Sequence, residues 1–317
     1  MTPAAGGSDA RRSILSGLIG QGVKPSLTPE MHEREAARQG IRYVYKTIDL
    51  PDDRLTEDHL RRLLGAAIEL GFDGLNITHP LKQTMVSLVD DVTSDVAAIG
   101  ALNTVLIRDD ATVGHNTDVT GFGRAFTEGL PGAALDELVL LGAGGAGTAV
   151  AHALVRLGAR RVQVFDPDAA RAGALVRSVE ASDDDVTVLR VDEAALAGAL
   201  AEASGLVNAT PVGMAGHPGS PLSSELLRPD LWVADIVYRP LVTDLLRAAG
   251  ALGCRTLSGA GMAVHQAADA FELITGRTAD RDAMVRDFDA MVAAESRGDH
   301  PRTTDESRPE EGTRNVS

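Results

Sequence analysis

Short apolar runs alternate with amphipathic segments along most of the chain, and this alternation predicts its secondary structure. In the first 120 residues the runs predict strands at 13–19, 43–48, 74–77 and 101–107. The amphipathic segments between them predict helices at 29–39, 57–70 and 82–88, with another starting near Thr120. Pro29 suits the first helical position, which makes Thr28 the expected cap. Alternating strands and helices favour an open α/β sheet.

A second alternation of the same kind follows from about residue 122. Its expected strands are 138–141, 161–165, 187–191, 205–208, 232–236 and 254–257. Its expected helices are 145–157, 168–178, 193–201 and 241–252, and two more are expected at 262–275 and 280–295. We therefore predict an α/β protein of two domains. An N-terminal open α/β substrate-binding and catalytic domain comprises 11–121 plus 258–295, and a Rossmann-type doubly wound dinucleotide-binding domain comprises 122–257. The polar ends, 1–10 and 297–317, are expected to be disordered.

The strand expected at 138–141 leads into a glycine-rich turn. This turn reads Gly142-Ala143-Gly144-Gly145-Ala146-Gly147 and fills the three positions of a G-x-G-x-x-G pattern. Such glycines allow a tight turn, a close approach of backbone to a pyrophosphate, and close helix–strand packing. A helical pattern and a second strand follow, and that strand ends on Asp166, 24 residues after Gly142. Because all these parts occur in order, the segment predicts a dinucleotide site rather than a plain βα turn.

Asp166 bears on the choice of cofactor. A carboxylate at this place binds both ribose hydroxyls of NAD and repels the 2′-phosphate of NADP. Asp168 adds negative charge, and Arg171 is the nearest basic residue, placed either under the adenine or simply at the start of the next helix. We predict NAD as the cofactor. The alternative is that Asp166 merely caps the helix expected near Ala169.

Composition excludes several classes of partner. The 317 residues carry a net charge of −15 with a pI of about 4.9, which argues against nucleic acid or an anionic membrane as partner. No apolar run reaches membrane-spanning length, and the apolar stretch 14–23 is interrupted by glycines with no cleavage site after it. The single cysteine, Cys254, has no apparent metal partners, fits a reducing compartment and is expected in the core. We expect a cytoplasmic protein without a metal site.

Polar residues cluster where predicted strands end and helices begin. These residues are Ser26, Thr28, Thr78, Lys82, Asn103, Asn116 and Asp118. Ligands of open α/β sheets bind at the carboxyl ends of strands, so the clusters are expected to converge on one small polyhydroxylated ligand. Individually, most of them also fit ordinary turn or cap positions. Asn103 is the exception, because an amide inside an apolar strand needs buried partners.

Lys82 is the preferred catalytic candidate. The chain has only three lysines among its 30 basic residues, so arginine fills most basic positions. A desolvated lysine can lose its proton, whereas arginine effectively cannot. A nearby aspartate would anchor such a lysine and help it transfer a proton.

Seven ordered motifs resemble the shikimate/quinate dehydrogenase family over residues 13–290. They are Gly17 to Gly20 with Ser26 to His32, Asn76 to Lys82, Ala101 to Thr104, Gly114 to Gly121, Asn208 to Met214, Asp235 to Tyr238, and His265 to Ala267. By this resemblance Lys82 and Asp118 are the catalytic pair. The implied substrate residues are Ser26 and Thr28 for a carboxylate, and Thr78, Asn103 and Gln266 for the ring hydroxyls, with Tyr238 nearby. The implied cofactor residues beyond the glycine-rich turn, Asp166 and Arg171 are Thr210, Val237 and Gly261.

Two departures from the family pattern bear on substrate and cofactor. The usual Pro-Val-x-His-Ser run is Gly22 to Ser26 here and lacks its histidine. Asp166-Pro167-Asp168 stands where NADP-linked biosynthetic members usually carry Asn-Arg followed by Thr or Ser. Together with Thr28 in place of the commoner serine, this resembles the NAD-dependent quinate/shikimate branch.

The resemblance implies reversible hydride transfer between NAD and C3 of shikimate or quinate, giving the 3-dehydro acid. The expected partners are these small molecules, with no nucleic acid or membrane, in a monomer or homodimer. Two alternatives remain open: a strict, biosynthetic shikimate dehydrogenase that accepts NADP, and a non-catalytic, ligand-sensing relative.

Overall fold

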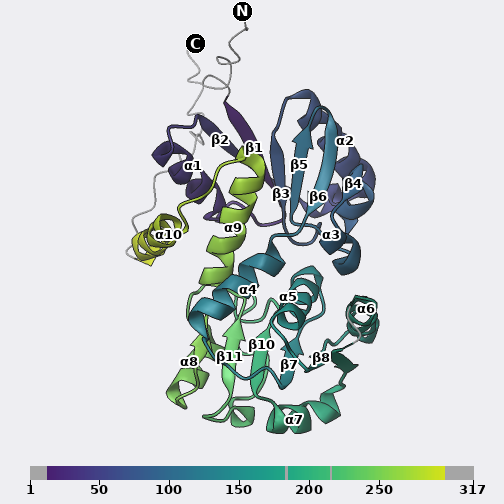
Figure 1. Ribbon diagram of the computed structural model, residues 1–317, viewed down its shortest axis with the longest axis vertical. Coiled ribbons are helices and arrows are strands. Elements are labelled where there is room, and N and C mark those ends of the chain that lie inside the picture. Colours follow the sequence, from purple (N-terminus) through teal and green to yellow (C-terminus); the bar gives the residue numbers. More distant parts are fainter. Residues whose placement is uncertain (1–12, 183–184, 215, 297–317) are drawn as a thin grey trace, which may run out of the picture.

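The computed structural model describes residues 13–182, 185–214 and 216–296. Figure 1 shows two sheets along the long axis of the molecule, one built from β1 to β6 and the other from β7 to β12. The predicted disorder at 1–10 and 297–317 lies outside the described residues. Among the described residues no helix is long and apolar enough to span a bilayer.

The first sheet is mixed, with the strand order β2-β1-β3-β5-β6-β4. Its strands are β1 (Ile14–Gly20), β2 (Tyr43–Asp49), β3 (Gly74–Ile77), β4 (Asp91–Val92), β5 (Thr104–Arg108) and β6 (Ala111–His115). β1 pairs in parallel with β2 and β3, whereas β5 pairs antiparallel with both β3 and β6. Asp109 and Asp110 join β5 to β6 with φ of 49° and 64°, a left-handed turn that aspartate tolerates.

Helices cover both faces of this sheet. They are α1 (Thr28–Arg38), α2 (Glu57–Glu69), α3 (Ser94–Ile99), α9 (Ala260–Thr275) and α10 (Arg281–Ser296), with short 3₁₀ turns at Asp52–Arg54 and Thr84–Ser87. Leu60 and Leu64 of α2 pack with Leu75 and Ile77 of β3, while α1, α9 and α10 share another apolar cluster. The helix predicted at 82–88 is only the 3₁₀ turn, and α3, β4 and β6 were not predicted, because segments this short carry little periodicity.

The second sheet is parallel throughout, in the order β12-β11-β10-β7-β8-β9. Its strands are β7 (Glu137–Leu141), β8 (Arg161–Phe165), β9 (Thr187–Arg190), β10 (Gly205–Asn208), β11 (Trp232–Asp235) and β12 (Thr256–Leu257). Its helices are α5 (Gly145–Arg156), α6 (Ala169–Glu180), α7 (Glu193–Glu202) and α8 (Asp244–Ala251), with a 3₁₀ turn at Ser224–Leu226. The predicted α/β class with a doubly wound sheet is confirmed.

The apolar residues of β7 alternate between the two faces of the second sheet. Leu138 and Leu140 pack with α5 and α6, and Val139 and Leu141 pack with α7 and α8. Both faces are therefore buried, which explains the continuous apolar run. β7 lies between β10 and β8, where the strand order reverses, and ligands of doubly wound sheets bind at that point.

α4 (Asp118–Gly129) and α9 pack against each other between the two sheets (Figure 1). Their contact is close: a Cβ added at Gly121 would lie 2.9 Å from Gln266, and one at Gly261 would lie 3.0 Å from Ala125. The predicted domain boundary at residues 121 and 122 falls inside α4. This helix thus begins at the first sheet and leads into the second.

Candidate functional site

Lys82 and Asp118 meet at one edge of the first sheet. Lys82 lies on the loop after β3, and Asp118 is the first residue of α4. The Lys82 Nζ atom is 2.5 Å from Asp118 Oδ2, and the two side chains are 17% and 6% exposed. The two residues predicted as a catalytic pair therefore form a largely buried ion pair.

Asp118 is held by two asparagines that precede it in the chain. Asn103 Nδ2 donates to Asp118 Oδ1 at 3.0 Å, and Asp118 N donates to Asn116 Oδ1 at 3.0 Å. The carboxylate also lies at the N-terminus of α4, where the helix dipole favours negative charge. Asp118 is not a cap, because Thr117 occupies the N-cap position. Asn103 lies one residue before β5 rather than inside it.

The loop that carries Lys82 is fixed through its backbone. Thr78 N donates to Ile19 O at 3.0 Å, and Leu102 N donates to Lys82 O at 2.9 Å. Thr78 also packs tightly on β1, since a Cβ added at Gly20 would lie 2.3 Å from its methyl group. The position of Lys82 is therefore set by β1 and by the segment that leads into β5.

Ser26, Thr28 and Tyr238 gather at the start of α1. Ser26 Oγ accepts from Thr28 N at 3.3 Å, and Ser26 is hydrogen-bonded to the Tyr238 hydroxyl. Burial raises the pKa of Tyr238, although Arg239 and the bond to Ser26 oppose that shift, so the phenol stays protonated. The expected cap role of Thr28 was wrong. Leu27 is the N-cap and Thr28 the first helical residue, because the turn begins one residue earlier than Pro29 suggested.

Gln266 lies on α9 and connects to the loop before α4. Its side chain donates from Nε2 to Ala263 O at 3.0 Å, and its backbone oxygen accepts from Thr117 Oγ1 at 3.0 Å. Thr117 adjoins Asp118, so Gln266 approaches the ion pair from α9. Gly261, one turn earlier in α9, lies in the packed contact with α4.

The glycine-rich turn has a shape that only glycine permits at two positions. Gly142 has φ of 96°, and a Cβ added there would lie 2.7 Å from Ala209 O. A Cβ added at Gly147 would lie 2.1 Å from Gly142 O. Gly144, by contrast, has open space around it and is the N-cap of α5 without a side-chain cap. The first N–H groups of α5 therefore suit the phosphates of a dinucleotide.

Asp166 holds this turn in place. Its Oδ2 accepts from Ala143 N at 2.8 Å, and its Oδ1 accepts from Asp168 N at 2.8 Å. The alternative that Asp166 caps the following helix is wrong, because Asp168 caps α6 by accepting from Ala170 N and Arg171 N. Arg171 lies 3.7 Å from Asp166 and 3.2 Å from Asp168, with its side chain 59% exposed.

Thr210 and Val237 follow the carboxyl ends of β10 and β11. The Thr210 hydroxyl donates to Asn208 Oδ1 at 2.7 Å, and Val237 N donates to Asp235 Oδ1 at 3.0 Å. Asn208 Nδ2 in turn donates to Asp235 Oδ1 at 3.0 Å, so the two strand ends are linked. Both residues thus lie at the same edge of the second sheet as the glycine-rich turn.

The two halves of the site come together at Gly145. A Cβ added to this glycine would lie 3.3 Å from the Ala101 Cβ and 3.5 Å from the Lys82 Cβ. The turn that suits a dinucleotide therefore lies directly against the lysine of the ion pair. The sequence predicted both features but gave no sign that they touch.

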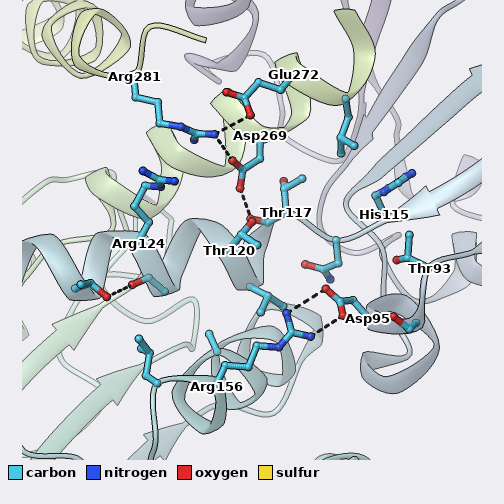
Figure 2. Close-up of a pocket in the computed structure, with 18 of the residues that line it drawn as sticks. Thr93, Asp95, His115, Thr117, Thr120, Arg124, Arg156, Asp269, Glu272 and Arg281 are labelled. Carbon is cyan, nitrogen blue, oxygen red and sulfur yellow. Dashed lines mark hydrogen bonds and ion pairs between the residues drawn. The ribbon is translucent and has the colours of Figure 1, made fainter. Parts of the chain in front are cut away.

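Figure 2 shows a separate hollow of about 1040 Å³ lined by residues of α4, α5, α9 and the start of α3. Arg156 pairs there with Asp95 at 2.5 Å, and Arg281 pairs with Asp269 at 2.6 Å. Its lining contains neither Lys82, Asp118 nor the glycine-rich turn. Because its paired charges largely cancel, we do not assign the chemistry to this hollow.

Two parts of the chain match known families. Residues 18–105 match the shikimate dehydrogenase substrate binding domain, and residues 259–286 match the shikimate 5′-dehydrogenase C-terminal domain. The chain is 54% identical over 276 residues to a shikimate dehydrogenase (NADP(+)) of Streptomyces avermitilis, covering 87% of this chain and 95% of that protein. It is 50% identical over 277 residues to a quinate/shikimate dehydrogenase (NAD(+)) of Corynebacterium glutamicum strain R, covering 87% and 98%.

Solved structures give the same picture. Quinate dehydrogenase from Corynebacterium glutamicum in complex with NAD superimposes with a TM-score of 0.81 at 49% identity, covering 88% of this chain and 99% of that one. Shikimate 5-dehydrogenase from Listeria monocytogenes in complex with shikimate and NAD superimposes with a TM-score of 0.76 at 32% identity, covering 86% and 96%. The resemblance of the seven motifs is thereby confirmed.

Proposed function

This chain belongs to the shikimate dehydrogenase family, and we propose that it oxidises shikimate or quinate reversibly at C3, with NAD as hydride acceptor, to the 3-dehydro acid. The observation that carries this proposal is the contact between the Lys82–Asp118 pair and the glycine-rich turn at Gly145. It joins a proton-transferring group to a dinucleotide site, and alcohol oxidation needs both.

Lys82 and Asp118 transfer the proton in this reaction. During oxidation the pair receives the proton of the C3 hydroxyl, and during reduction it returns that proton. Because Lys82 Nζ and Asp118 Oδ2 are only 2.5 Å apart, the proton is assigned to the pair rather than to either residue. NAD bound on the glycine-rich turn would supply the hydride acceptor. Burial of the pair limits competition from water for the reacting hydroxyl.

The remaining residues hold the substrate. Ser26 and Thr28, with Tyr238 hydrogen-bonded to Ser26, are proposed to bind the carboxylate. Thr78, Asn103 and Gln266 are proposed to bind the ring hydroxyls. Two of these residues contact the loop that precedes α4, since Asn103 bonds Thr117 and Asp118 and the Gln266 backbone oxygen accepts from Thr117 Oγ1, which supports this proposal.

The choice of NAD rests on Asp166, because the relatives divide. The NADP-dependent relative at 54% identity and the NAD-dependent one at 50% are too similar in identity to decide the cofactor. Asp166 presents a carboxylate at the end of β8, and the exposed guanidinium of Arg171 is shared with two carboxylates. This arrangement favours ribose hydroxyls over a 2′-phosphate.

A two-acid, two-cofactor assay tests the function. Shikimate and quinate are each supplied with NAD or NADP, and formation of reduced cofactor is followed by absorbance. We expect Lys82→Met and Asp118→Asn to lower kcat by about a hundredfold or more while the fold survives. Lys46→Met is the matched control, because Lys46 is an exposed lysine on β2. Near-normal turnover by folded Lys82→Met would contradict the proposal, and no turnover of either acid by the wild type would favour a ligand sensor.

We also propose that the enzyme is cytoplasmic and acts as a monomer or homodimer. The cytoplasmic assignment is supported by the single cysteine, Cys254. Sedimentation of the purified chain at micromolar concentration, with and without NAD, distinguishes the two assembly states.

A further inference from the structure

We propose that Tyr45, Asn76, Thr104 and Asn103 form a directed chain of hydrogen bonds that positions the Asp118 carboxylate for the reaction. Thr104 and Tyr45 are accordingly positioning residues that act through Asn103. This inference rests on the proposed role of the Lys82–Asp118 pair. Tyr45, Asn76 and Thr104 lie on β2, β3 and β5, and none of the three is among the proposed catalytic or substrate-binding residues.

The direction of the chain is fixed at Asn103. Thr117 N donates to Asn103 Oδ1 at 2.8 Å, and a backbone N–H can only donate, so this end of the amide is the oxygen. The Asn103 Nδ2 therefore faces Asp118 Oδ1 at 3.0 Å and Thr117 Oγ1 at 2.8 Å. The Thr117 hydroxyl donates its own hydrogen to Gln266 O, so its oxygen accepts from Asn103 Nδ2.

The remaining bonds follow from that orientation. The Thr104 hydroxyl lies 3.1 Å from Asn103 Oδ1 and must donate to it, so it accepts from Asn76 Nδ2 at 3.0 Å. Asn76 Nδ2 also points at the backbone oxygen of Asn103, at 3.4 Å, which agrees with this amide orientation. Asn76 Oδ1 then accepts from the Tyr45 hydroxyl at 2.7 Å. Every donor points towards Asp118.

The four residues of this hydrogen-bonded chain are buried, which restricts the orientations that their side chains can adopt. Tyr45, Asn76, Asn103 and Thr104 are 7%, 4%, 3% and 0% exposed. Buried hydrogen bonds are strengthened by their low-dielectric surroundings, and an orphaned buried donor is costly. All four hydrogen-bonding places of the Asn103 amide are filled, so turning Asp118 away would leave one of its hydrogens unpaired. A ring hydroxyl that binds Asn103 would have to displace or share one of these four bonds, while the others keep the amide in the same orientation.

Thr104→Val is the principal test, because valine keeps the shape of threonine and removes the hydroxyl. We expect kcat to fall about tenfold, within the range of a single positioning contact, while the KM for NAD changes by less than about twofold. The acidic limb of the kcat/KM pH profile should move, because Asn103 loses one of the two donors that hold its amide towards Asp118. The charged group that faces Asp118 is Lys82, and the charge of Lys82 also lowers the pKa of His79 nearby, after the larger effect of burial. Thr104→Ser should restore both kcat and the profile.

Thr112→Val is the matched control. Thr112 is 1% exposed on the adjacent strand β6, and its hydroxyl donates to Asp90 at 2.7 Å, outside the chain. Its kcat and pH profile should match the wild type. If Thr104→Val fails to fold, Tyr45→Phe decides, with an expected change in the same direction of about two- to threefold.

The outcomes separate this inference from the proposed function. A wild-type kcat and pH profile in Thr104→Val, or the same loss in Thr112→Val, overturns the positioning role. The proposed function still stands in that case if Lys82→Met is inactive. An active Lys82→Met overturns the proposed function itself, whatever Thr104→Val does. A lowered kcat and a moved pH profile in Thr104→Val, both restored in Thr104→Ser, support the proposed chain of hydrogen bonds.

Discussion

Replacement of Asp166 by asparagine separates the two roles of this carboxylate. In the protein its oxygens accept from Ala143 N and Asp168 N, each at 2.8 Å, with the side chain only 7% exposed. In the proposed function the same carboxylate recognises the ribose hydroxyls of NAD. Asparagine has nearly the same shape, but only one of its two polar ends accepts a hydrogen bond from a backbone N–H.

The substitution should change both the folding stability and the cofactor preference. One of the two backbone N–H groups must lose its acceptor, and the other bond loses its charge, so we expect a loss of about 1–2 kcal/mol in folding stability. In a chain of this size that lowers Tm by roughly 2–8 °C. Weaker ribose bonds should lower kcat/KM for NAD about 5- to 30-fold, while NADP is no longer repelled. The NAD/NADP ratio should therefore fall by roughly 10- to 100-fold.

The assay compares kcat/KM for both cofactors at a fixed, saturating acid concentration, together with thermal unfolding without cofactor. Asp168→Asn is the control, because Asp168 carries the same charge two residues away but caps α6 from an exposed position. An unchanged cofactor ratio in Asp166→Asn would refute the reasoning. So would an equal change in Asp168→Asn, since the effect would then come from general charge rather than from ribose recognition.

Three further outcomes are expected. Gly147→Ala should lose about 3 kcal/mol or more of stability, because its Cβ would lie 2.1 Å from Gly142 O, whereas Gly144→Ala should keep the wild-type Tm without cofactor; equal Tm values would contradict this. Burial lowers the pKa of His32 from 6.5 to about 3, so below pH 6.5 the unfolded chain binds the extra proton and stability falls on acidification. Urea unfolding should show a loss of about 2 kcal/mol from this residue between pH 7 and 5, and His32→Gln should show a smaller loss. Burial also raises the pKa of the Cys254 thiol, so a disulfide reagent should label it slowly in the native state and at once in urea; rapid native labelling would be inconsistent with its burial.

The glycine-rich turn and the second sheet were predictable in detail because their signals are local. Gly142, Gly147 and Asp166 follow a spacing set by one βαβ unit, and the structure shows close backbone contacts at both glycines. The N-caps were less predictable. Thr28 and Asp166 both had plausible capping roles in the sequence, but Leu27 and Asp168 occupy those positions. Neighbouring residues with similar capping propensity differ by too little for the sequence to decide between them.

The first sheet shows why the candidate site was partly predictable. Polar residues were expected to gather at the carboxyl ends of parallel strands, and this holds for Thr78 and Lys82 after β3. Asn103, however, precedes its strand, and a parallel β5 would have carried it to the opposite edge of the sheet.

The antiparallel hairpin removes this difficulty. In the register of the sheet, Asn76 pairs with Thr104, and Thr104 pairs with His115. The end of β3, the start of β5 and the end of β6 therefore share one edge. Asn103, just before β5, and Asp118, just after β6, reach Lys82 for this reason. The turn at Asp109 and Asp110 thus returns the chain to the edge where Asp118 meets Lys82, although the motifs that suggested the chemistry include neither aspartate of the turn.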